Sequence, residues 1–268
     1  MRKMVDHLIL SIGVVVFCAP LLLLVMAATR PGGLDAPSLW PGGALAENLS
    51  RLWALGLPGG RLPDLGSMLF TSGLVAAAVG MLNTVVSFLA AYALVYFRRG
   101  PGRGVFWLSL ATLYFPVEAR LLPTFDVVTG LGLLNTMAGL VLPVLPLAVG
   151  TFLFRQDLRQ LPDALAEAAR LDGAGPLRFL WDIVLPLSRG PIALVLMIGM
   201  IWGWNQYLWP LMVSVDDRHW TLMRGLQMVS PGSGAGAALA VLAMLPALVL
   251  VLGVLRLLGQ SARFPPRD

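Results

Sequence analysis

The residues best suited to polar contacts in this 268-residue chain lie in a charged segment between Arg155 and Arg189. Long hydrophobic runs flank this segment on both sides. Inside it, Glu167-Ala168-Ala169 is followed after three residues by Gly173, and after nine more by Ile183-x-Leu185-Pro186. A spacing with so many fixed positions rarely arises by chance. Charged side chains grouped between apolar runs are suited to binding another protein, so we predict that this segment is a docking site.

Catalytic chemistry has little support elsewhere in the sequence. Cys18 is the only cysteine, so the chain cannot form an internal disulfide or a thiolate cluster. His7 and His219 are far apart and neither belongs to a zinc-binding pattern. Lys3 is the only lysine, which excludes a Gly-x4-Gly-Lys-[Ser/Thr] phosphate loop. We predict that the chain is not an enzyme and holds no metal or cofactor, and that any ATP and magnesium are bound by a partner.

The composition is that of a membrane protein. Hydrophobic residues make up 57% of the chain and charged residues 12%, whereas soluble domains carry roughly a quarter charged residues. The mean hydropathy is +0.80. The net charge of +5 could indicate nucleic acid or an anionic surface. Because the charges cluster in loops between apolar runs, we expect contact with membrane lipid and none with nucleic acid.

Six segments are long and apolar enough to cross a bilayer, which takes about 20 residues in a helix. We predict a single transmembrane domain over residues 1–268, with an external loop at 29–66 and a cytoplasmic loop at 157–189. Prolines in or near several spans predict kinked helices. The predicted spans are 8–28, 67–97, 104–124, 136–156, 190–214 and 234–258.

Orientation follows from the basic residues of the short loops. A cytoplasmic N-terminus places most of the lysine and arginine residues in the cytoplasm, together with the C-terminus and the 157–189 loop. The basic residues left outside are Arg30, Arg51, Arg61, Arg218 and Arg224. Residues 1–28 could instead be a secretory signal cleaved near Ala27-Ala28, but the apolar run is long for a signal, so we predict that it is retained.

Local signals predict two short helices in the charged loop. Pro162 suits a helix start, and Gly173 can adopt positive φ at the end of that helix. A second helix is predicted from Pro176 to Leu185, before Pro186. In the first helix, Leu161, Leu165, Ala168 and Ala169 are predicted to share one face. Without further information, this amphipathic pair could equally rest on lipid headgroups.

The complete pattern from Glu167 to Pro186 resembles the signature loop of the membrane subunits of ATP-binding-cassette (ABC) importers. Residues 116–124, 151–156 and 203–211 are similar to the second permease subunit of sn-glycerol-3-phosphate importers, in the carbohydrate-uptake group related to maltose permeases. The similarity runs from about residue 5 to residue 258. It implies an all-α, type I importer permease fold with six transmembrane helices in the bacterial inner membrane. A coupling helix would lie between the fourth and fifth spans, and we call 157–189 the coupling loop.

The resemblance also implies partners and a function. This chain would pair with a second, related permease subunit, two ATP-binding subunits and an extracytoplasmic substrate-binding protein. It would form half of the path for sn-glycerol-3-phosphate or glycerophosphodiesters by alternating access. A sugar, an oligosaccharide or a polyol is an alternative cargo, and a stand-alone secondary transporter is a weaker alternative. In the coupling loop, Glu167 would meet a polar or basic group of the ATPase, and Ala168 and Ala169 would pack in its groove. The implied coupling residues are Glu167, Ala168, Ala169, Asp172, Gly173 and Pro186.

Several polar or aromatic residues are candidates for the translocation path or a gate, and each has a structural alternative. Glu118 and Arg120 need a partner or water at membrane depth. They could belong to a structural ion pair, or Arg120 could lie near an anionic phosphate. The remaining candidates could form helix contacts or an interfacial aromatic belt instead of a path. These residues are Asn83, Ser87, Trp204, Asn205, Gln206 and Tyr207.

Overall fold

The computed structural model describes residues 2–35, 40–55, 63–97, 102–145, 148–230 and 232–261. Arg61, named above as external, lies outside them, as does part of the predicted external loop. All regular elements within these ranges are helices. The chain divides into two compact units, one of Met1–Thr71 with Asp216–Leu248, the other of Ser72–Val215 with Val249–Asp268. Helices α3 (Leu65–Tyr96) and α14 (Gly234–Ser261) contribute to both units.

Three helices are long and apolar enough to cross a membrane, namely α1 (Arg2–Ala28), α3 and α14. Three bent helix pairs pass the same test, so the described residues hold up to six candidate spans. The pairs are Gly104–Tyr114 with Glu118–Gly130, bent by 105°, Met137–Val144 with Ala148–Leu158, bent by 52°, and Pro176–Leu187 with Arg189–Trp204, bent by 80°.

Three of the predicted spans are not continuous helices, and the one predicted at 136–156 is divided between Met137–Val144 and Ala148–Leu158. The segment predicted at 104–124 breaks before Pro116, whose ring disfavours a helical conformation of the preceding residue. The segment predicted at 190–214 breaks after Trp204. There Asn205 stands at the C-cap, where its backbone N–H and its amide Nδ2 both donate to the Ile201 carbonyl, each at 3.0 Å.

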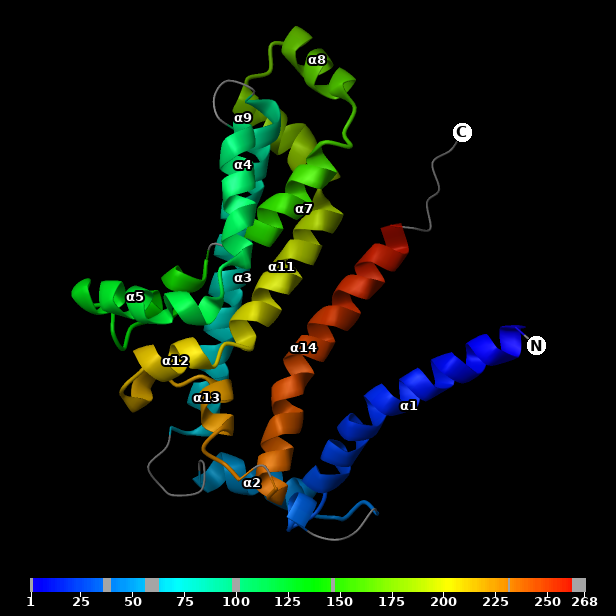
Figure 1. The fold of residues 1–268 in the computed structure, drawn as a ribbon, viewed down its shortest axis with the longest axis vertical. Helices are drawn as coiled ribbons and strands as arrows, with labels where there is room; N and C mark the ends of the chain where they lie inside the picture. The colour runs from blue at the N-terminus through cyan, green and yellow to red at the C-terminus, as the bar shows by residue number, and fades with distance from the viewer. Residues whose placement is uncertain are drawn as a thin grey trace. The chain divides into compact units, whose positions relative to one another are not determined.

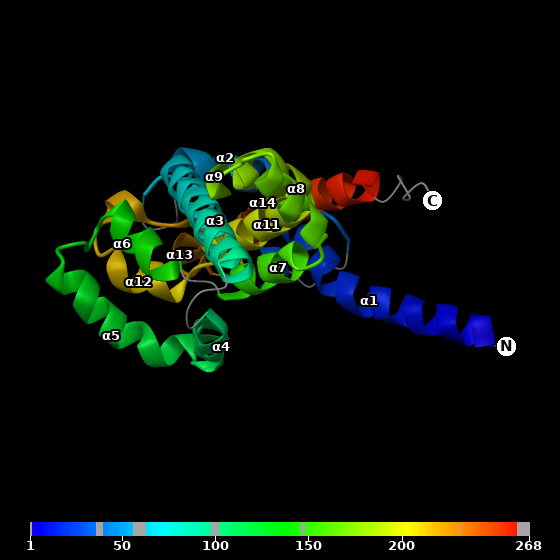
Figure 2. The ribbon, with the colours of Figure 1, turned by 90° about the horizontal axis from the view of Figure 1, so that it is seen from above.

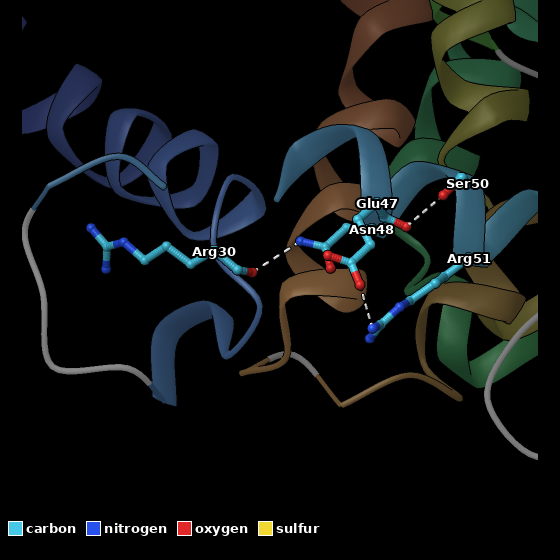
Figure 3. A network of polar contacts seen from close by, with 5 residues as sticks. All are labelled: Arg30, Glu47, Asn48, Ser50 and Arg51. Carbon is cyan, nitrogen blue, oxygen red and sulfur yellow. Dashed lines mark hydrogen bonds and ion pairs between the residues drawn. The ribbon is translucent and has the colours of Figure 1, made fainter. Parts of the chain in front are cut away.

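In the first unit, the helix α2 (Leu45–Leu55) closes the C-terminal end of α1. The Asn48 side chain is 2% exposed and donates to the carbonyls of Ala28 and Arg30, each at 2.9 Å. Figure 3 shows the bond to Arg30. The Ala28 carbonyl is one that the end of α1 leaves without a partner within the helix. A Cβ at Gly234, where α14 starts, would lie 2.0 Å from the Arg30 carbonyl oxygen, so only glycine fits there. This unit also holds η1 (Gly33–Asp35), η5 (Asp217–His219) and α13 (Leu222–Leu226).

In the second unit, α3, α7 (Ala148–Leu158) and α11 (Arg189–Trp204) run side by side (Figures 1 and 2). Small residues allow their close approach. A Cβ on Gly199 of α11 would lie 2.9 Å from the Gly80 Cα of α3, and one on Gly150 of α7 would lie 2.7 Å from the Ser87 Oγ. Helices in lipid lack a hydrophobic drive to associate, so close backbone packing of this kind holds them together.

Six further helices of this unit lie before or after the bend at Pro116. They are α4 (Gly102–Ala111), η2 (Thr112–Tyr114), α5 (Val117–Gly130), α6 (Met137–Val141), η3 (Leu142–Val144) and α12 (Leu208–Val213). Helix α5 extends away from the α3, α7 and α11 group in both views (Figures 1 and 2). Trp209 is 4% exposed and donates its Nε1 hydrogen to the Gly139 carbonyl at 2.9 Å, which joins α12 to α6.

Candidate functional site

Helix α8 (Asp163–Leu171) occupies the first predicted helix of the coupling loop. Pro162 stands at its N-cap and Asp163 places a negative charge in its first turn, where the helix dipole favours it. At the other end, Gly173 has φ +74° and donates to the Arg170 carbonyl, while the Ala174 N–H donates to the Ala169 carbonyl. These two bonds form a Schellman motif, which ends the helix as the glycine predicted.

The two faces of α8 differ in what they contact. Leu165, Ala166 and Ala169 pack against the hydrophobic core formed with α3, α7 and α11, and Ala169 is 5% exposed. The opposite face consists of Ala164, Glu167, Ala168 and Leu171, all exposed, with Leu171 at 89%. We call these four residues the docking stripe. The prediction that Ala168 and Ala169 share a face is wrong, because Ala169 is buried against the chain's own core.

The second helical segment is longer than predicted. It comprises α9 (Pro176–Phe179), the π-helical turn η4 (Leu180–Val184) and α10 (Leu185–Leu187). The predicted end before Pro186 is therefore wrong. Pro186 lies at the start of the α10 turn, where a missing N–H removes no bond that the helix needs. Asp172, at the C-cap of α8, and Pro186 are both exposed.

Two long-range hydrogen bonds fix the coupling loop to the helices below it. The Tyr92 hydroxyl of α3 donates to the Pro176 carbonyl at 2.7 Å. The Ser188 hydroxyl donates to Asp157 Oδ2 at 3.0 Å and thereby closes the base of the loop. Under the loop, Phe154 is fully buried and its ring meets Phe88 edge to face, with 5.0 Å between centroids. These contacts tie the coupling loop to α3 and α7.

A groove of about 1140 Å³ lies between α8 and the ends of α3 and α7. Its lining carries both signs of charge, with Arg155, Arg159 and Arg170 opposite Asp163 and Glu167. Two large apolar side chains of the second helical segment are also exposed, Leu177 at 71% and Trp181 at 64%. An exposed apolar patch with a charged rim is typical of a protein-binding surface. Sequence reasoning missed Leu171, Leu177 and Trp181, because their exposure depends on how the loop packs.

A second cavity, of about 250 Å³, brings together two of the predicted path residues. Asn83 of α3 and Arg120 of α5 both line it, beside Trp202 of α11 and Thr112 of η2. Trp202 and Thr112 were not predicted as site residues. Asn83 is 2% exposed, and its Oδ1 accepts a hydrogen bond from the Ser87 hydroxyl at 3.2 Å. Ser87 lies in the contact between α3 and α7, so it orients Asn83 rather than lining the cavity.

The other path candidates lie away from this cavity. Trp204 is buried in α11, and Asn205 is exposed with its amide bonded to the Ile201 carbonyl. Gln206 and Tyr207 are half-buried in the link to α12. Glu118 is exposed in the first turn of α5, and no cation within the described residues pairs with it. The described part of the chain also contains no group of three or more His, Cys, Asp or Glu residues that could hold a metal ion.

The chain holds up to six helical spans, and α8 is fixed to the core with its docking stripe exposed. These features define a class of protein, namely a multi-spanning membrane subunit that works with a partner. The family described as "Binding-protein-dependent transport system inner membrane component" matches residues 1–264. The chain belongs to this family. It is therefore a permease subunit of an ABC importer of the inner membrane, it is not an enzyme, and it works with an ATPase and a substrate-binding protein.

Relatives in several bacteria share most of the sequence. The sn-glycerol-3-phosphate transport system permease protein UgpE of Yersinia pestis bv. Antiqua is 42% identical over 255 residues, covering 92% of this chain and 90% of that protein. The UgpE proteins of Pectobacterium atrosepticum and Agrobacterium fabrum are 41% and 39% identical, with coverage of 92% and 93% of this chain and 91% and 92% of those proteins.

A solved structure has the same fold. It is that of a bacterial ABC transporter involved in the import of the acidic polysaccharide alginate, with a TM-score of 0.76. It covers 95% of each chain at 20% sequence identity, so the likeness concerns the fold. The predicted all-α, type I importer permease fold is confirmed.

Proposed function

We propose that this chain forms one half of the translocation path for sn-glycerol-3-phosphate or glycerophosphodiesters. It pairs with a second, related permease subunit, and two ATP-binding subunits dock on the cytoplasmic side. Both termini and the coupling loop lie in the cytoplasm, in agreement with the positions of the arginines. An extracytoplasmic binding protein delivers the cargo to the opposite side.

The observation that carries this proposal is the docking stripe of α8. An exposed leucine next to small alanine side chains fits a shallow groove, and Glu167 adds a charge that can select a basic or polar partner group. ATP and magnesium bind to the partner subunits. When ATP closes these subunits together, they pull on α8, and the buried contacts of Ala169 and Phe154 transmit the movement to α3 and α7. Nucleotide thus supplies the differential binding energy that alternating access requires.

The cargo is inferred from the relatives, whose names specify sn-glycerol-3-phosphate. Thermal-shift measurements on the cognate binding protein test it directly. We expect glycerol-3-phosphate or a glycerophosphodiester to raise its melting temperature, and maltose-type sugars to leave it unchanged. Stabilisation by a sugar alone would reassign the cargo while the importer machinery remained the same.

The coupling role is tested with two changes in the docking stripe. Leu171→Asp places a charge in the proposed contact, and Glu167→Lys reverses one. We expect both to abolish ATP-driven uptake in vesicles and to prevent recovery of the ATPase in a pull-down, while the subunit still inserts. Gln160→Lys is the control for Glu167→Lys, since it introduces the same lysine side chain at an exposed position of the loop outside α8. Normal ATPase recovery with both stripe variants would refute the assignment. Uptake by the chain without nucleotide or ATPase would overturn the importer proposal itself.

A further inference from the structure

The 250 Å³ cavity of the second unit contains a positive charge, and no described residue of its lining supplies a counter-charge. Arg120 lines it from the first turn of α5 and is half-buried. Among the described residues, no carboxylate lies within ion-pair distance of Arg120, and Glu118, two positions earlier, turns to the exposed side. An arginine at membrane depth costs about 2.5–3.5 kcal/mol on insertion scales. An ion pair with another described residue therefore does not explain why Arg120 stands here.

The opposite wall of the cavity offers a neutral hydrogen-bond donor. Asn83 is 2% exposed, and its Oδ1 is occupied by the Ser87 hydroxyl. The donors that Asn83 offers to the cavity are therefore the two hydrogens of Nδ2. The hydroxyl of Thr112 already donates to the Ser109 carbonyl at 2.6 Å, so it supplies no further donor. The polar side chains of the cavity thus present a guanidinium and an amide N–H2, which is a donor set suited to an anion.

The rest of the wall is apolar. Trp202 and Ile198 of α11 and Phe115 at the bend surround the polar groups. An indole face beside amide donors suits a short carbon chain that carries hydroxyl groups. The combination of one cation, one amide and an aromatic wall, in a volume sufficient for a small molecule, fits a compact phosphorylated polyol better than a neutral oligosaccharide.

We propose that this cavity is a subsite for the phosphate group of the cargo. Arg120 binds the phosphate through charge-assisted hydrogen bonds, Asn83 Nδ2 donates to a phosphate or hydroxyl oxygen, and Trp202 packs against the carbon chain. This inference rests on the proposed cargo and deepens it, because it assigns recognition of the phosphate to residues of this subunit. A lipid headgroup carries the same phosphate chemistry, so the experiment must separate the two sources.

The first test measures uptake of labelled glycerol-3-phosphate by the complete importer in vesicles with ATP inside and its liganded binding protein outside. Arg120→Gln keeps hydrogen-bond donors and removes the charge, and we expect uptake to fall about ten- to a hundredfold, as for the loss of charge-assisted hydrogen bonds. Arg120→Lys should recover part of the uptake, because it restores the positive charge. Asn83→Asp, which keeps the side-chain shape, should also lower uptake, because it replaces the donor with a negative charge. Arg256→Gln, at an exposed arginine of α14, is the matched control and should leave uptake unchanged.

The second test measures binding without delivery by the binding protein. The melting temperature of the purified assembly is followed with the ATPase sites filled by a non-hydrolysable ATP analogue. We expect glycerol-3-phosphate and inorganic phosphate to raise the melting temperature of the wild type and of the Arg256→Gln variant, but not that of Arg120→Gln. Glycerol should have no effect. Stabilisation by short-chain phosphatidic acid alone would assign Arg120 to a lipid headgroup and overturn the proposal.

The outcomes separate the subsite from the proposed function. If the wild-type importer takes up no glycerol-3-phosphate, the proposed cargo fails. If it does, and Arg120→Gln keeps the same uptake and the same thermal shift, only the subsite fails. If Arg120→Gln loses the second permease subunit in a pull-down, then the arginine pairs with that subunit, and the subsite is equally overturned.

Discussion

The coupling loop and the bend around Pro116 belong to the same unit but are held in different ways. The coupling loop is fixed by hydrogen bonds between residues distant in sequence, from Tyr92 to Pro176 and from Ser188 to Asp157. At the bend, the hydrogen bonds are local, as from the Phe115 N–H to the Thr112 carbonyl. Phe115 is 64% exposed, whereas Phe154 under the coupling loop is fully buried. The difference indicates that the coupling loop is held more rigidly than the wall beside the Arg120 cavity.

The largest effect on stability is expected when a phenylalanine of the coupling loop region is replaced by alanine. The same type of substitution at the bend serves as the comparison. Phe154→Ala removes a fully buried ring that meets Phe88, and we expect the free energy of unfolding to fall by about 3–5 kcal/mol. Phe115→Ala, at the exposed bend, should change it by less than about 1 kcal/mol. Thermal unfolding of the purified subunits measures both. Equal losses would show that the bend is as firmly packed as the coupling loop, and the comparison would fail.

A smaller effect is expected at the base of the coupling loop. Ser188 is fully buried and its hydroxyl bonds to the Asp157 carboxylate, so either alanine substitution should cost about 1.5–3 kcal/mol, the range for a hydrogen bond to a charged group. A double-mutant cycle with Asp157→Ala and Ser188→Ala separates the pair from the rest of the site. If the two losses simply add, then the bond does not close the loop and the loop is held by packing alone.

The turn after α8 should respond to backbone strain rather than to crowding. Gly173 has φ +74°, yet a Cβ there would meet no atom within 4 Å. Gly173→Val should therefore cost about 1–2 kcal/mol from conformation alone, and Gly173→Asn clearly less, because asparagine tolerates left-handed backbone. ATP-driven uptake should follow the same order. A severe loss of uptake with the asparagine variant would mean that a partner, and not the backbone, requires glycine at this position.

The sequence predicted the coupling loop well because its signals are local. Pro162 and Gly173 mark the two ends of α8 within a dozen residues, and the observed caps are the ones that these residue types favour. It did not predict which edge of α8 faces the core. Spacings of three and four from Leu165 fit both Ala168 and Ala169, and only packing against α3 and α7 selects Ala169.

The Arg120 cavity shows more clearly what could not be predicted from the sequence. Asn83 and Arg120 were recognised as polar residues at membrane depth, but nothing local indicates that they share a cavity with Trp202. Their meeting depends on the close helix contact at Gly199 and on the bend at Pro116. Proline predicted a kink there, whereas the 105° angle follows from contacts made after the chain turns.

The smallest effect is expected at Glu118, two positions before Arg120, where the largest effect on uptake is expected. Glu118 and Arg120 share the first turns of α5, yet only Arg120 lines the cavity. Glu118→Gln removes an exposed charge that has no ion-pair partner among the described residues, so stability should change by no more than about 0.5 kcal/mol. Uptake of glycerol-3-phosphate should be unchanged or slightly increased, because a negative charge near the path of an anion is lost. A loss as large as that expected for Arg120→Gln would show that the whole bend, rather than one arginine, controls passage of the cargo.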